Sequence, residues 1–444
     1  MSHPMRHGAQ GSKPRGARSV AQEILLRTEA AGQYADRALD AALSREVQLG
    51  AQDKALVTTL FYGVIEHRIT LDYIIDGLSS IAPSAIERGV RMTLRVALYQ
   101  LLYLDRIPDH AAINEAVELS PRRSKGFVNA LLRSFCRQGK AVAYPDRADE
   151  PFAYLSVRYS VPTDTAEVFC RIFGLTRAEA LLAAFEEHPP VTVRTNTLKL
   201  SREELLSRVP GAVPTKNAPF GVVLPSDAPL HALISEGLCF VQDEASQLAV
   251  AALAAEPHMR VLDLCAAPGS KSFGAAMDMA NTGEVRSFDL HENKLSLIRR
   301  GAATLGITTL TADAGDARAA HPDALGTFDR VICDVPCSGF GVLAKKPDIR
   351  YKDIHSAAGL LPVQAAILRA AGELVAPGGI LLYSTCTLLP AENEEQIGAF
   401  LEEHQEFSLE AWSVGDVAAE GMLTLAPDTH GTDGFFIARL RRQG

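Results

Sequence analysis

The chain has 444 residues, of which 47% are hydrophobic and 22% are charged. These fractions are typical of globular proteins, so they exclude a largely disordered or fibrous chain. At roughly 100–200 residues per domain, the length predicts two to four domains. No run of 18 apolar residues is present, which argues against a membrane span. Seven cysteines, in a chain whose polar N-terminus does not read as a signal peptide, predict free thiols in a cytoplasmic protein.

The net charge of −9 is unevenly distributed. Residues 1–150 hold 20 Lys and Arg against 17 Asp and Glu, whereas the remaining residues hold 24 against 36. An acidic chain is at first sight a poor nucleic-acid binder, but a basic-leaning front part permits RNA contact through local patches. The charge therefore neither requires nor excludes an RNA partner.

The first part of the chain is predicted to be helical. Residues 1–17 are expected to form a disordered basic tail. Residues 18–140 show the apolar spacing of helices, as in Ala55–Ile65, Val90–Leu104 and Gly126–Phe135. Because no strand pattern interrupts this region, an all-α bundle is predicted.

A polar, proline-flanked linker is predicted at residues 141–151. Residues 152–240 mix helical patterns with short β-like runs such as Val191–Asn196, and they are expected to form a small α+β subdomain. Arg194 and Asn196 would then lie on an edge strand of that subdomain.

Residues 241–444 are predicted to form a doubly wound parallel sheet of the Rossmann-like α/β class. Buried strands alternate with helices there, and ligands of such sheets bind at the carboxyl ends of the strands. The predicted strands are Arg260–Leu264, Glu284–Phe288, Thr308–Ala312, Arg330–Cys333 and Gly379–Tyr383, and the predicted helices are Lys271–Met279, Glu292–Leu305 and Pro362–Val375.

The ends of the first three strands carry candidate ligand-binding residues. A turn of small residues, 265–271, lets backbone N–H groups approach a ligand, although it lacks GxGxxG and an ordinary strand–helix turn fits as well. Asp289 ends the second strand, where an acidic residue suits ribose hydroxyls. After the third strand, either Asp313 or Asp316 could face an adenine amino group while the other caps a helix, and the spacing does not decide between them.

Two cysteines lie directly beyond neighbouring strands of the same sheet. Cys337 follows the fourth strand and Cys386 the fifth, so both thiols are expected to open into one cleft. No CxxC pair or His/Cys cluster accompanies them, which argues against zinc or another metal, and a reducing compartment argues against a disulfide. The other cysteines are expected to be packing residues: Cys136, Cys170, Cys239, Cys265 and Cys333.

Three motifs of the sheet resemble the signature motifs of the RNA 5-methylcytosine methyltransferases of the Nop2/Sun family. They are LDLCAAPGSK (262–271), CDVPCSG (333–339) and YSTCTLLPAENE (383–394). The paired PC and TC motifs, in this order on one sheet, are highly specific. One departure is Ser270, where the family usually has glycine, and a hydroxymethyl group there would lie near the methionine end of the cofactor.

The resemblance extends over residues 18 to 440. VQDEASQLA (241–249) and DGFFIARL (433–440) match further blocks of the family. The front bundle, with ALVTTLFYGVIEHRITLD (55–72) and KGFVNALLR (125–133), is similar to the NusB-like RNA-binding domain of a bacterial member that modifies ribosomal RNA.

The resemblance implies a cytosine-5 methyltransferase that uses S-adenosylmethionine on 16S rRNA. Cys386 of the TC motif would be the nucleophile that adds to carbon 6 of cytosine, and Cys337 of the PC motif would promote product release. Asp334 would hold the N3/N4 edge of the base, and Lys271 would lower a thiolate pKa or contact the base. The cofactor would be bound by Cys265, Ala266, Ala267, Pro268, Gly269, Ser270, Lys271, Asp289, Asp334 and one or both of Asp313 and Asp316.

An RNA substrate requires a flipped or unpaired cytosine and further contact surface. The candidate contacts, each of which has a purely structural reading as well, are Arg122, Arg123 and Lys125 before the last bundle helix, Arg194 and Asn196, and Arg350 and Tyr351. The substrate would be free or partly assembled small-subunit RNA rather than DNA, with no membrane partner, and the protein is expected to be a monomer.

Two other functions share some of these sequence features. A DNA cytosine-5 methyltransferase would use the PC cysteine as nucleophile, but the TC cysteine, the NusB-like bundle and the lack of a target-recognition insert argue against it. A NusB-like assembly factor with a vestigial methyltransferase fold is the alternative of another class. The presence of Asp334, Cys337 and Cys386 together argues against that reading.

Overall fold

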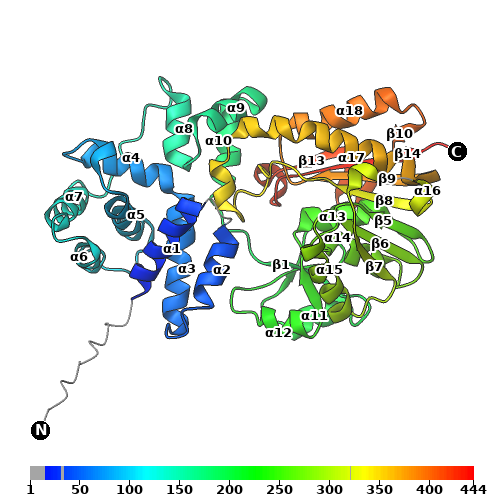
Figure 1. The fold of residues 1–444 in the computed structure, drawn as a ribbon, viewed down its shortest axis with the longest axis horizontal. Coiled ribbons are helices and arrows are strands. Elements are labelled where there is room, and N and C mark those ends of the chain that lie inside the picture. The colour runs from blue at the N-terminus through cyan, green and yellow to red at the C-terminus, as the bar shows by residue number, and fades with distance from the viewer. Residues whose placement is uncertain (1–15, 32–34, 321) are drawn as a thin grey trace, which may run out of the picture. The chain divides into compact units, whose positions relative to one another are not determined.

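The computed structural model describes residues 16–31, 35–320 and 322–444, and it divides into two compact units (Figure 1). The first unit runs to Leu175 and also includes Lys346–Tyr351. The second unit comprises the rest of the chain from Thr176 onward. The predicted N-terminal tail falls outside the described residues except for Gly16 and Ala17, the latter being the first residue of a helix.

The first unit is helical throughout its described residues, apart from connecting loops, which confirms the predicted bundle. Its central helix is buried almost all round, with Leu94 and Leu98 fully shielded from solvent, and it packs against five of its neighbours. The helices are α1 (Ala17–Ala31), α2 (Ala35–Leu43), α3 (Ala51–Glu66), α4 (Arg68–Leu78), α5 (Arg88–Tyr103, the central one), α6 (Asp109–Leu119), α7 (Lys125–Arg137), α8 (Pro151–Tyr159) and α9 (Thr163–Phe173).

Helices α8 and α9 differ from the predicted domain division. The sequence pattern assigned them to a small α+β subdomain beginning at residue 152, but α8 packs on α4 and α9 packs on α8 within the first unit. Buried hydrogen bonds connect the two parts, since Thr70 Oγ1 donates to the carbonyl of Val157 at 2.6 Å. Apolar faces recur in both regions, so periodicity alone cannot say which neighbour a helix packs against.

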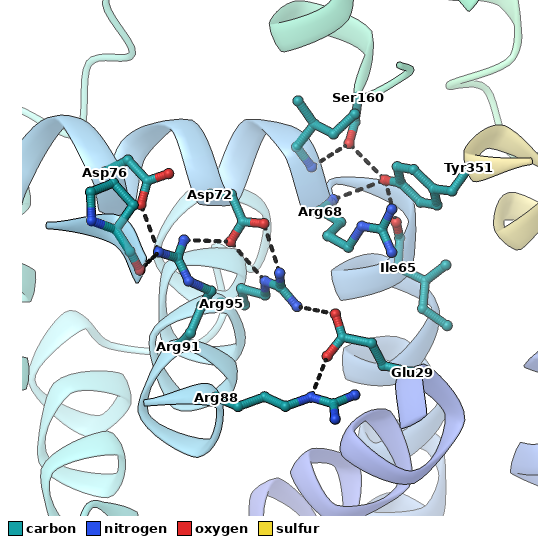
Figure 2. Close-up of polar contacts among 12 residues, drawn as sticks. Glu29, Ile65, Arg68, Asp72, Asp76, Arg88, Arg91, Arg95, Ser160 and Tyr351 are labelled. Atoms are coloured by element: carbon teal, nitrogen blue, oxygen red, sulfur yellow. Dashed lines mark hydrogen bonds and ion pairs between the residues drawn. The ribbon is translucent and has the colours of Figure 1, made fainter. Parts of the chain in front are cut away.

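A network of charged side chains joins α1, α4 and α5 in the first unit (Figure 2). Arg95, which is 6% exposed, donates to both oxygens of Asp72 and to Glu29. Arg91 bonds Asp72 and Asp76, and Arg88 contacts Glu29 from a more exposed position. Burial of a guanidinium is tolerated when its donors are paired in this way, whereas removing one partner leaves uncompensated charge.

The segment Lys346–Tyr351 is held in the first unit by Arg350 and Tyr351 (Figure 2 shows the tyrosine). Arg350 is 1% exposed and donates to the carbonyl of Tyr159 and to Glu66. The Tyr351 hydroxyl donates to the carbonyl of Ile65 at 2.6 Å and also bonds Ser160. The expectation that these two residues contact RNA is therefore corrected, because their polar groups are used inside the protein.

In the second unit, four short strands form an antiparallel sheet in the order β2-β3-β1-β4. Three helices precede or connect these strands along the chain: α10 (Leu175–Ala184), α11 (Arg202–Arg208) and α12 (Leu230–Ser235). The strands are β1 (Thr192–Thr195), β2 (Val213–Pro214), β3 (Gly221–Val223) and β4 (Cys239–Val241). β1 is thus an inner strand, not the edge strand that was predicted. Arg194, on that strand, is 1% exposed and pairs with Asp278, and Asn196 is fully buried and donates to the carbonyls of Gly237 and Leu305. Their assignment as RNA contacts is corrected for the same reason.

The large sheet of the second unit has the order β10-β14-β9-β8-β5-β6-β7, with β13 paired to β14. Its parallel strands are β5 (Arg260–Asp263), β6 (Glu284–Asp289), β7 (Leu310–Ala314), β8 (Phe328–Asp334) and β9 (Val375–Thr385). Antiparallel strands complete one end: β10 (Phe407–Leu409), β13 (Met422–Leu425) and β14 (Phe435–Arg442).

Helices cover both faces of this sheet (Figure 1). α13 (Glu244–Leu253), α14 (Ser270–Asp278) and α15 (Glu292–Leu305) enclose one core, which contains Val261 and Ile332. α17 (Leu361–Leu374) and α18 (Glu394–Glu403) enclose the other, which contains Val331 and Tyr383. Alternate residues of one strand thus enter opposite cores, which explains why these strands are apolar throughout.

The predicted fold class is confirmed, and the predicted helix over Glu292–Leu305 coincides with α15. Strand β9 extends beyond the predicted Gly379–Tyr383 at both ends, from Val375 to Thr385, with Gly378 inside it. The antiparallel strands at the end of the sheet were not predicted, since the apolar run of β14 carries no signal of strand direction.

We expect Arg95→Ala to destabilise the first unit by about 2 kcal/mol, because it leaves Asp72 and Glu29 without their shared buried cation. Arg88→Ala is the matched control, since Arg88 pairs with the same Glu29 but is 56% exposed, and its effect should stay within about 0.5 kcal/mol. Urea unfolding followed by far-UV circular dichroism measures both. Equal effects would contradict the importance of burial.

Candidate active site

The parallel pairing of β8 with β9 brings the two predicted cysteines together. Asp334 at the end of β8 is in register with Ser384 of β9, so the loops that follow leave the sheet side by side. The Sγ atoms of Cys337 and Cys386 are 3.1 Å apart, and the backbone N–H of Cys386 donates to Cys337 Sγ at 3.3 Å. Both cysteines are free thiols and partly exposed.

An ion pair lies at the same strand ends. Lys271, on the first turn of α14, donates to one oxygen of Asp334 at 2.6 Å, and the Ser384 hydroxyl donates to the other at 2.6 Å. The Lys271 ammonium also lies 5.1 Å from the ring centroid of Phe435, and its side chain is 9% exposed. The aspartate is thus held in a fixed orientation while 30% of its side chain stays exposed.

The surroundings of the cysteines raise the pKa values of their thiols for different reasons. The pKa of Cys337 is raised well above its usual value by its hydrogen bond with Cys386, by burial and by nearby negative charge from Cys386 and Glu392. Burial raises the pKa of Cys265 and of Cys333, so both are inert thiols at neutral pH. Cys265 therefore has the environment expected of a packing residue rather than of a nucleophile.

The loop 265–271 is fixed to the end of β6. The N–H of Ala266 donates to the carbonyl of Phe288, and the N–H of Ala267 donates to Asp289. Gly269 has a φ of +112°, and a Cβ there would lie 2.5 Å from the Phe273 ring, so glycine is required at this position. Ser270 instead begins α14 without a positive φ, which means that its backbone accepts serine.

Asp289 is 7% exposed and is oriented by its neighbours. One oxygen accepts the N–H of His291 at 3.0 Å and lies 3.4 Å from Lys294 Nζ. The other accepts the Ala267 N–H of the loop. The carboxylate therefore links the glycine-containing loop to the start of α15.

A cavity of about 200 Å³ opens beside this carboxyl end of the sheet. Leu264, Phe288, Asp316 and Ala317 contribute to its mostly apolar lining. Asp316 caps a short 3₁₀ turn and binds Arg318 through both oxygens. Asp313 is not part of the lining and lies 3.6 Å from Arg286, so the structure places Asp316, and not Asp313, at the cavity.

Asp263, at the end of β5, is a buried carboxyl that the sequence did not single out. Its Oδ2 accepts the Ser272 hydroxyl at 2.6 Å, and Ser287 bonds Ser272 in turn. Burial raises the pKa of Asp263 to about 7, against the lowering effect of the Ser272 bond. The carboxyl group of Asp263 is therefore mostly protonated, and so neutral, at pH values below about 7.

Further residues of the site were also missed from sequence. Lys345 bonds Asp243 at 2.5 Å and Asp433 at 2.8 Å, which joins the VQDEASQLA and DGFFIARL motifs near the cysteine loops. The carbonyl of Cys386 accepts the N–H of Gly341, whose own carbonyl accepts the N–H of Gly434. The two motif blocks were the only hint in the sequence that these residues belong to the site. Lys345, Asp243 and Asp433 are so far apart in the chain that only the fold shows that they pair.

The predicted basic cluster of the first unit is at its surface. Arg123 has a side chain 75% exposed and pairs with Glu87, Lys125 pairs with Glu118, and Arg122 is exposed. Across residues 16–31, 35–320 and 322–444, no helix is long and apolar enough to cross a membrane. The same described ranges contain no cluster of three or more His, Cys, Asp or Glu side chains placed to hold a metal ion.

Comparison with protein families gives two matches. Residues 250–441 match the model of 16S rRNA methyltransferase RsmB/F, and residues 15–137 match the model of the NusB family. Among solved structures, that of PH0851 covers 97% of this chain with a TM-score of 0.76 and 26% sequence identity. NSun6 from Pyrococcus horikoshii with SFG covers 64% of it with a TM-score of 0.56 and 21% identity, which shows a shared fold.

The fold, the site and these matches define the class: a ribosomal RNA methyltransferase with an N-terminal NusB-type helical domain. A probable ribosomal RNA small subunit methyltransferase B of Bacillus subtilis is 37% identical over 97% of this chain and its own full length. The protein of that name from Citrobacter koseri is 33% identical over 96% of this chain and 99% of its own. The chain belongs to the family of ribosomal RNA small subunit methyltransferase B.

We expect the stability of the second unit to fall as pH rises from about 4 to above 7, because folded Asp263 keeps its proton up to about pH 7 while the unfolded carboxyl loses it near pH 4. Asp263→Asn should remove this contribution and be more stable than wild type at pH 8 by about 2–4 kcal/mol. Urea unfolding followed by fluorescence of Trp412, the single tryptophan, reports on this unit.

The control for this measurement is Asp313→Asn, because Asp313 is a half-exposed carboxyl on the same sheet. The control variant should keep the pH dependence of wild type. An unchanged pH dependence in Asp263→Asn would show that Asp263 does not carry the buried proton.

Proposed function

We propose that this protein transfers a methyl group from S-adenosylmethionine to carbon 5 of a cytosine in 16S rRNA, through a covalent adduct on Cys386. The observation that carries the proposal is the pair of thiols 3.1 Å apart at the ends of neighbouring parallel strands, with the Asp334–Lys271 ion pair at the same edge. The resemblance of the PC and TC motifs assigns the roles of the two cysteines.

Carbon 5 of cytosine is a weak nucleophile, so the reaction requires covalent activation. The Cys386 thiolate adds to carbon 6, which forms an S–C6 bond and makes carbon 5 an enamine carbon able to attack a methyl group. After methyl transfer, a base removes the proton from carbon 5 and the S–C6 bond breaks, which restores the thiolate. Cys337 promotes this last step, and its raised pKa keeps it a neutral thiol that does not compete for carbon 6.

Asp334 and Lys271 are proposed to handle the base. The carboxylate of Asp334 is suited to accept a hydrogen bond from the N4 amino group of cytosine. Once N3 has taken up a proton from solvent, which balances the negative charge of thiolate addition, the carboxylate can accept from N3–H as well. Lys271 and Ser384 hold the carboxylate in one orientation through 2.6 Å bonds. The lysine ammonium also favours negative charge nearby, including that of a thiolate.

The chain offers a site that fits S-adenosylmethionine. The apolar cavity beside Phe288 and Asp316 suits adenine, Asp289 suits the ribose hydroxyls, and the loop 265–271 brings backbone close to the methionine part. Gly269 leaves room that a Cβ would fill. The cofactor supplies an electrophilic methyl group when it is bound. SFG, which is named in the structure of NSun6, is an analogue of it.

The substrate cytosine is proposed to leave its stack, since two strand ends cannot be reached by a paired base. Arg122, Arg123 and Lys125 are proposed as phosphate contacts of the helical unit, in keeping with its NusB family match. Their present partners, Glu87 and Glu118, are surface carboxylates whose pairing is weak and screened by salt. We propose that the protein acts as a monomer in the cytoplasm, where thiols stay reduced.

We expect Asp289→Ala to weaken S-adenosylmethionine binding at least tenfold, because it removes the proposed ribose acceptor and the anchor of the Ala267 N–H. Asp316→Asn should weaken binding less, and Asp313→Asn should leave it unchanged because Asp313 is outside the cavity. Isothermal titration calorimetry measures all three. A larger loss from Asp313→Asn than from Asp316→Asn would reverse the assignment of the adenine contact.

We expect Cys386→Ala to abolish both methyl transfer and the covalent adduct, whereas Cys337→Ala should trap the enzyme on RNA. The reason is that the first variant removes the nucleophile and the second removes the group that promotes breakdown of the S–C6 bond. Each variant is incubated with 16S rRNA and S-adenosylmethionine, and a denaturant-stable protein–RNA band is sought by gel electrophoresis.

The matched control for these two variants is Cys239→Ala, since Cys239 is a buried thiol on β4, outside the loops of the proposed site. It should form no stable band and should still methylate. A band from Cys386→Ala instead would assign the nucleophile to Cys337, as in the DNA enzymes. Absence of both methyl transfer and adduct in every variant would favour an assembly factor.

A further inference from the structure

Glu392, in the YSTCTLLPAENE motif, is a fully buried carboxylate behind the two cysteine loops. One oxygen accepts the Ser338 hydroxyl at 2.5 Å. The other accepts the Ser338 N–H at 2.9 Å and the Gln364 amide at 2.8 Å. No lysine, arginine or histidine in the described part of the chain forms an ion pair with it, so hydrogen-bond donors alone stabilise this buried charge.

The donors around Glu392 require an acceptor at both of its oxygens. A carboxylate accepts at both, whereas a glutamine in the same place would turn one N–H₂ group toward other donors. Burying a carboxylate without a counter-ion is unfavourable unless its oxygens are hydrogen-bonded, as they are here by Ser338 and Gln364. The donors of these two residues therefore specify a carboxylate at this place.

The same carboxylate ties together the loops of both cysteines. Ser338 follows Cys337 directly, and the Gln364 amide that binds Glu392 also donates to the carbonyl of Pro336 at 3.0 Å, on the other side of Cys337. The Ser338 hydroxyl lies 2.9 Å from Thr387 Oγ1, and Thr387 follows Cys386. Both residues that flank Cys337 are thus fixed by one network, which also reaches the Cys386 loop.

Glu392 also acts on the charge of Cys337. Its negative charge contributes to the raised pKa of that thiol, after the hydrogen bond with Cys386, burial and the charge of Cys386. Two further titratable groups contact this network: Lys352, which donates to the carbonyl of Ser338, and Tyr383, whose hydroxyl donates to the carbonyl of Glu392. Cys333 and Asp334 lie near enough to Tyr383 to raise its pKa. Lys352 does not contact the carboxylate of Glu392, so the net effect at Cys337 is to keep the proton on sulfur.

From this geometry we propose that Glu392 is a positioning residue for product release: it holds Cys337 beside Cys386, so that Cys337 serves breakdown of the RNA adduct and not attack on the base. This rests on the proposed two-cysteine function. Glu392 touches neither substrate nor cofactor in this role, and it acts through Ser338, Gln364 and Thr387.

The first test uses the full-length protein with 16S rRNA and S-adenosylmethionine. Glu392→Gln should slow repeated turnover at least tenfold, while a single round of methyl transfer changes less than threefold and the denaturant-stable adduct accumulates as in Cys337→Ala. Glu395→Gln, three residues along on an exposed position of α18, is the matched control and should behave as wild type. A loss of single-round transfer equal to the loss of turnover would overturn a role in release.

The second test does not depend on RNA chemistry. In a Cys386→Ala background, the pH profile of Cys337 alkylation by iodoacetamide is read by mass spectrometry. Adding Glu392→Gln should move the profile to lower pH and raise the alkylation rate at neutral pH about threefold or more, since the thiolate fraction grows while its nucleophilicity falls only partly. Cys333, which is fully buried, must stay unmodified, because its alkylation would report unfolding.

The two tests separate the inference from the function on which it rests. If Cys337→Ala traps the adduct but Glu392→Gln neither traps it nor shifts the alkylation profile, the inference is overturned and the function stands. If Cys337→Ala traps nothing, the release role of Cys337 is lost, and the alkylation profile alone decides whether Glu392 controls that thiol.

A second variant covers the case in which Glu392→Gln exposes Cys333. Ser338→Ala keeps the Ser338 N–H bond and removes only the hydroxyl link to Glu392 and Thr387. It should accumulate adduct to an intermediate level. Adduct at the level of Glu395→Gln would overturn the inference in that case.

Discussion

The site depends on the parallel register of two neighbouring strands. Because Asp334 of β8 is paired with Ser384 of β9, the two strands end level with each other at the same edge of the sheet, and the loops that follow begin side by side. Two thiols then meet at 3.1 Å although they are far apart in the chain. A slip of one residue in this register would turn alternate side chains to opposite faces of the sheet and separate the two cysteines.

Three carboxyl groups surround this edge, and each is stabilised by a different means. Asp334 is paired with the Lys271 ammonium, burial beside Ser272 raises the pKa of Asp263 to about 7, and Glu392 accepts hydrogen bonds at both oxygens. A single small region thus presents one ion-paired carboxylate, one carboxyl group with a raised pKa and one buried carboxyl group that only hydrogen bonds hold. Of the three, Glu392 contributes its negative charge to the raised pKa of Cys337, together with the hydrogen bond to Cys386 and burial.

The sequence sufficed for the helical bundle, for the parallel core of the sheet and for the proximity of Cys337 and Cys386, because periodicity and strand-end position are local signals. It failed where the answer depends on which distant element covers a residue. Arg194 and Arg350 are of a residue type that often contacts RNA, yet each is about 1% exposed. Their guanidinium groups bind partners on other elements of the protein. Glu392 lay within a recognised motif, but its donors come from Ser338 and Gln364, and only the fold assembles them.

The short segment Lys346–Tyr351 interrupts the chain of the second unit and packs within the first. Covalent order therefore does not follow the division into units: no single cut yields both as separate, intact pieces. A fragment that begins after Leu175 would carry Arg350 and Tyr351 without Glu66, Ile65 and Ser160, and would leave a guanidinium and a phenol without the groups that now satisfy them. The helical unit expressed alone would lack the same inserted residues, so each unit needs the full chain for its complete set of contacts.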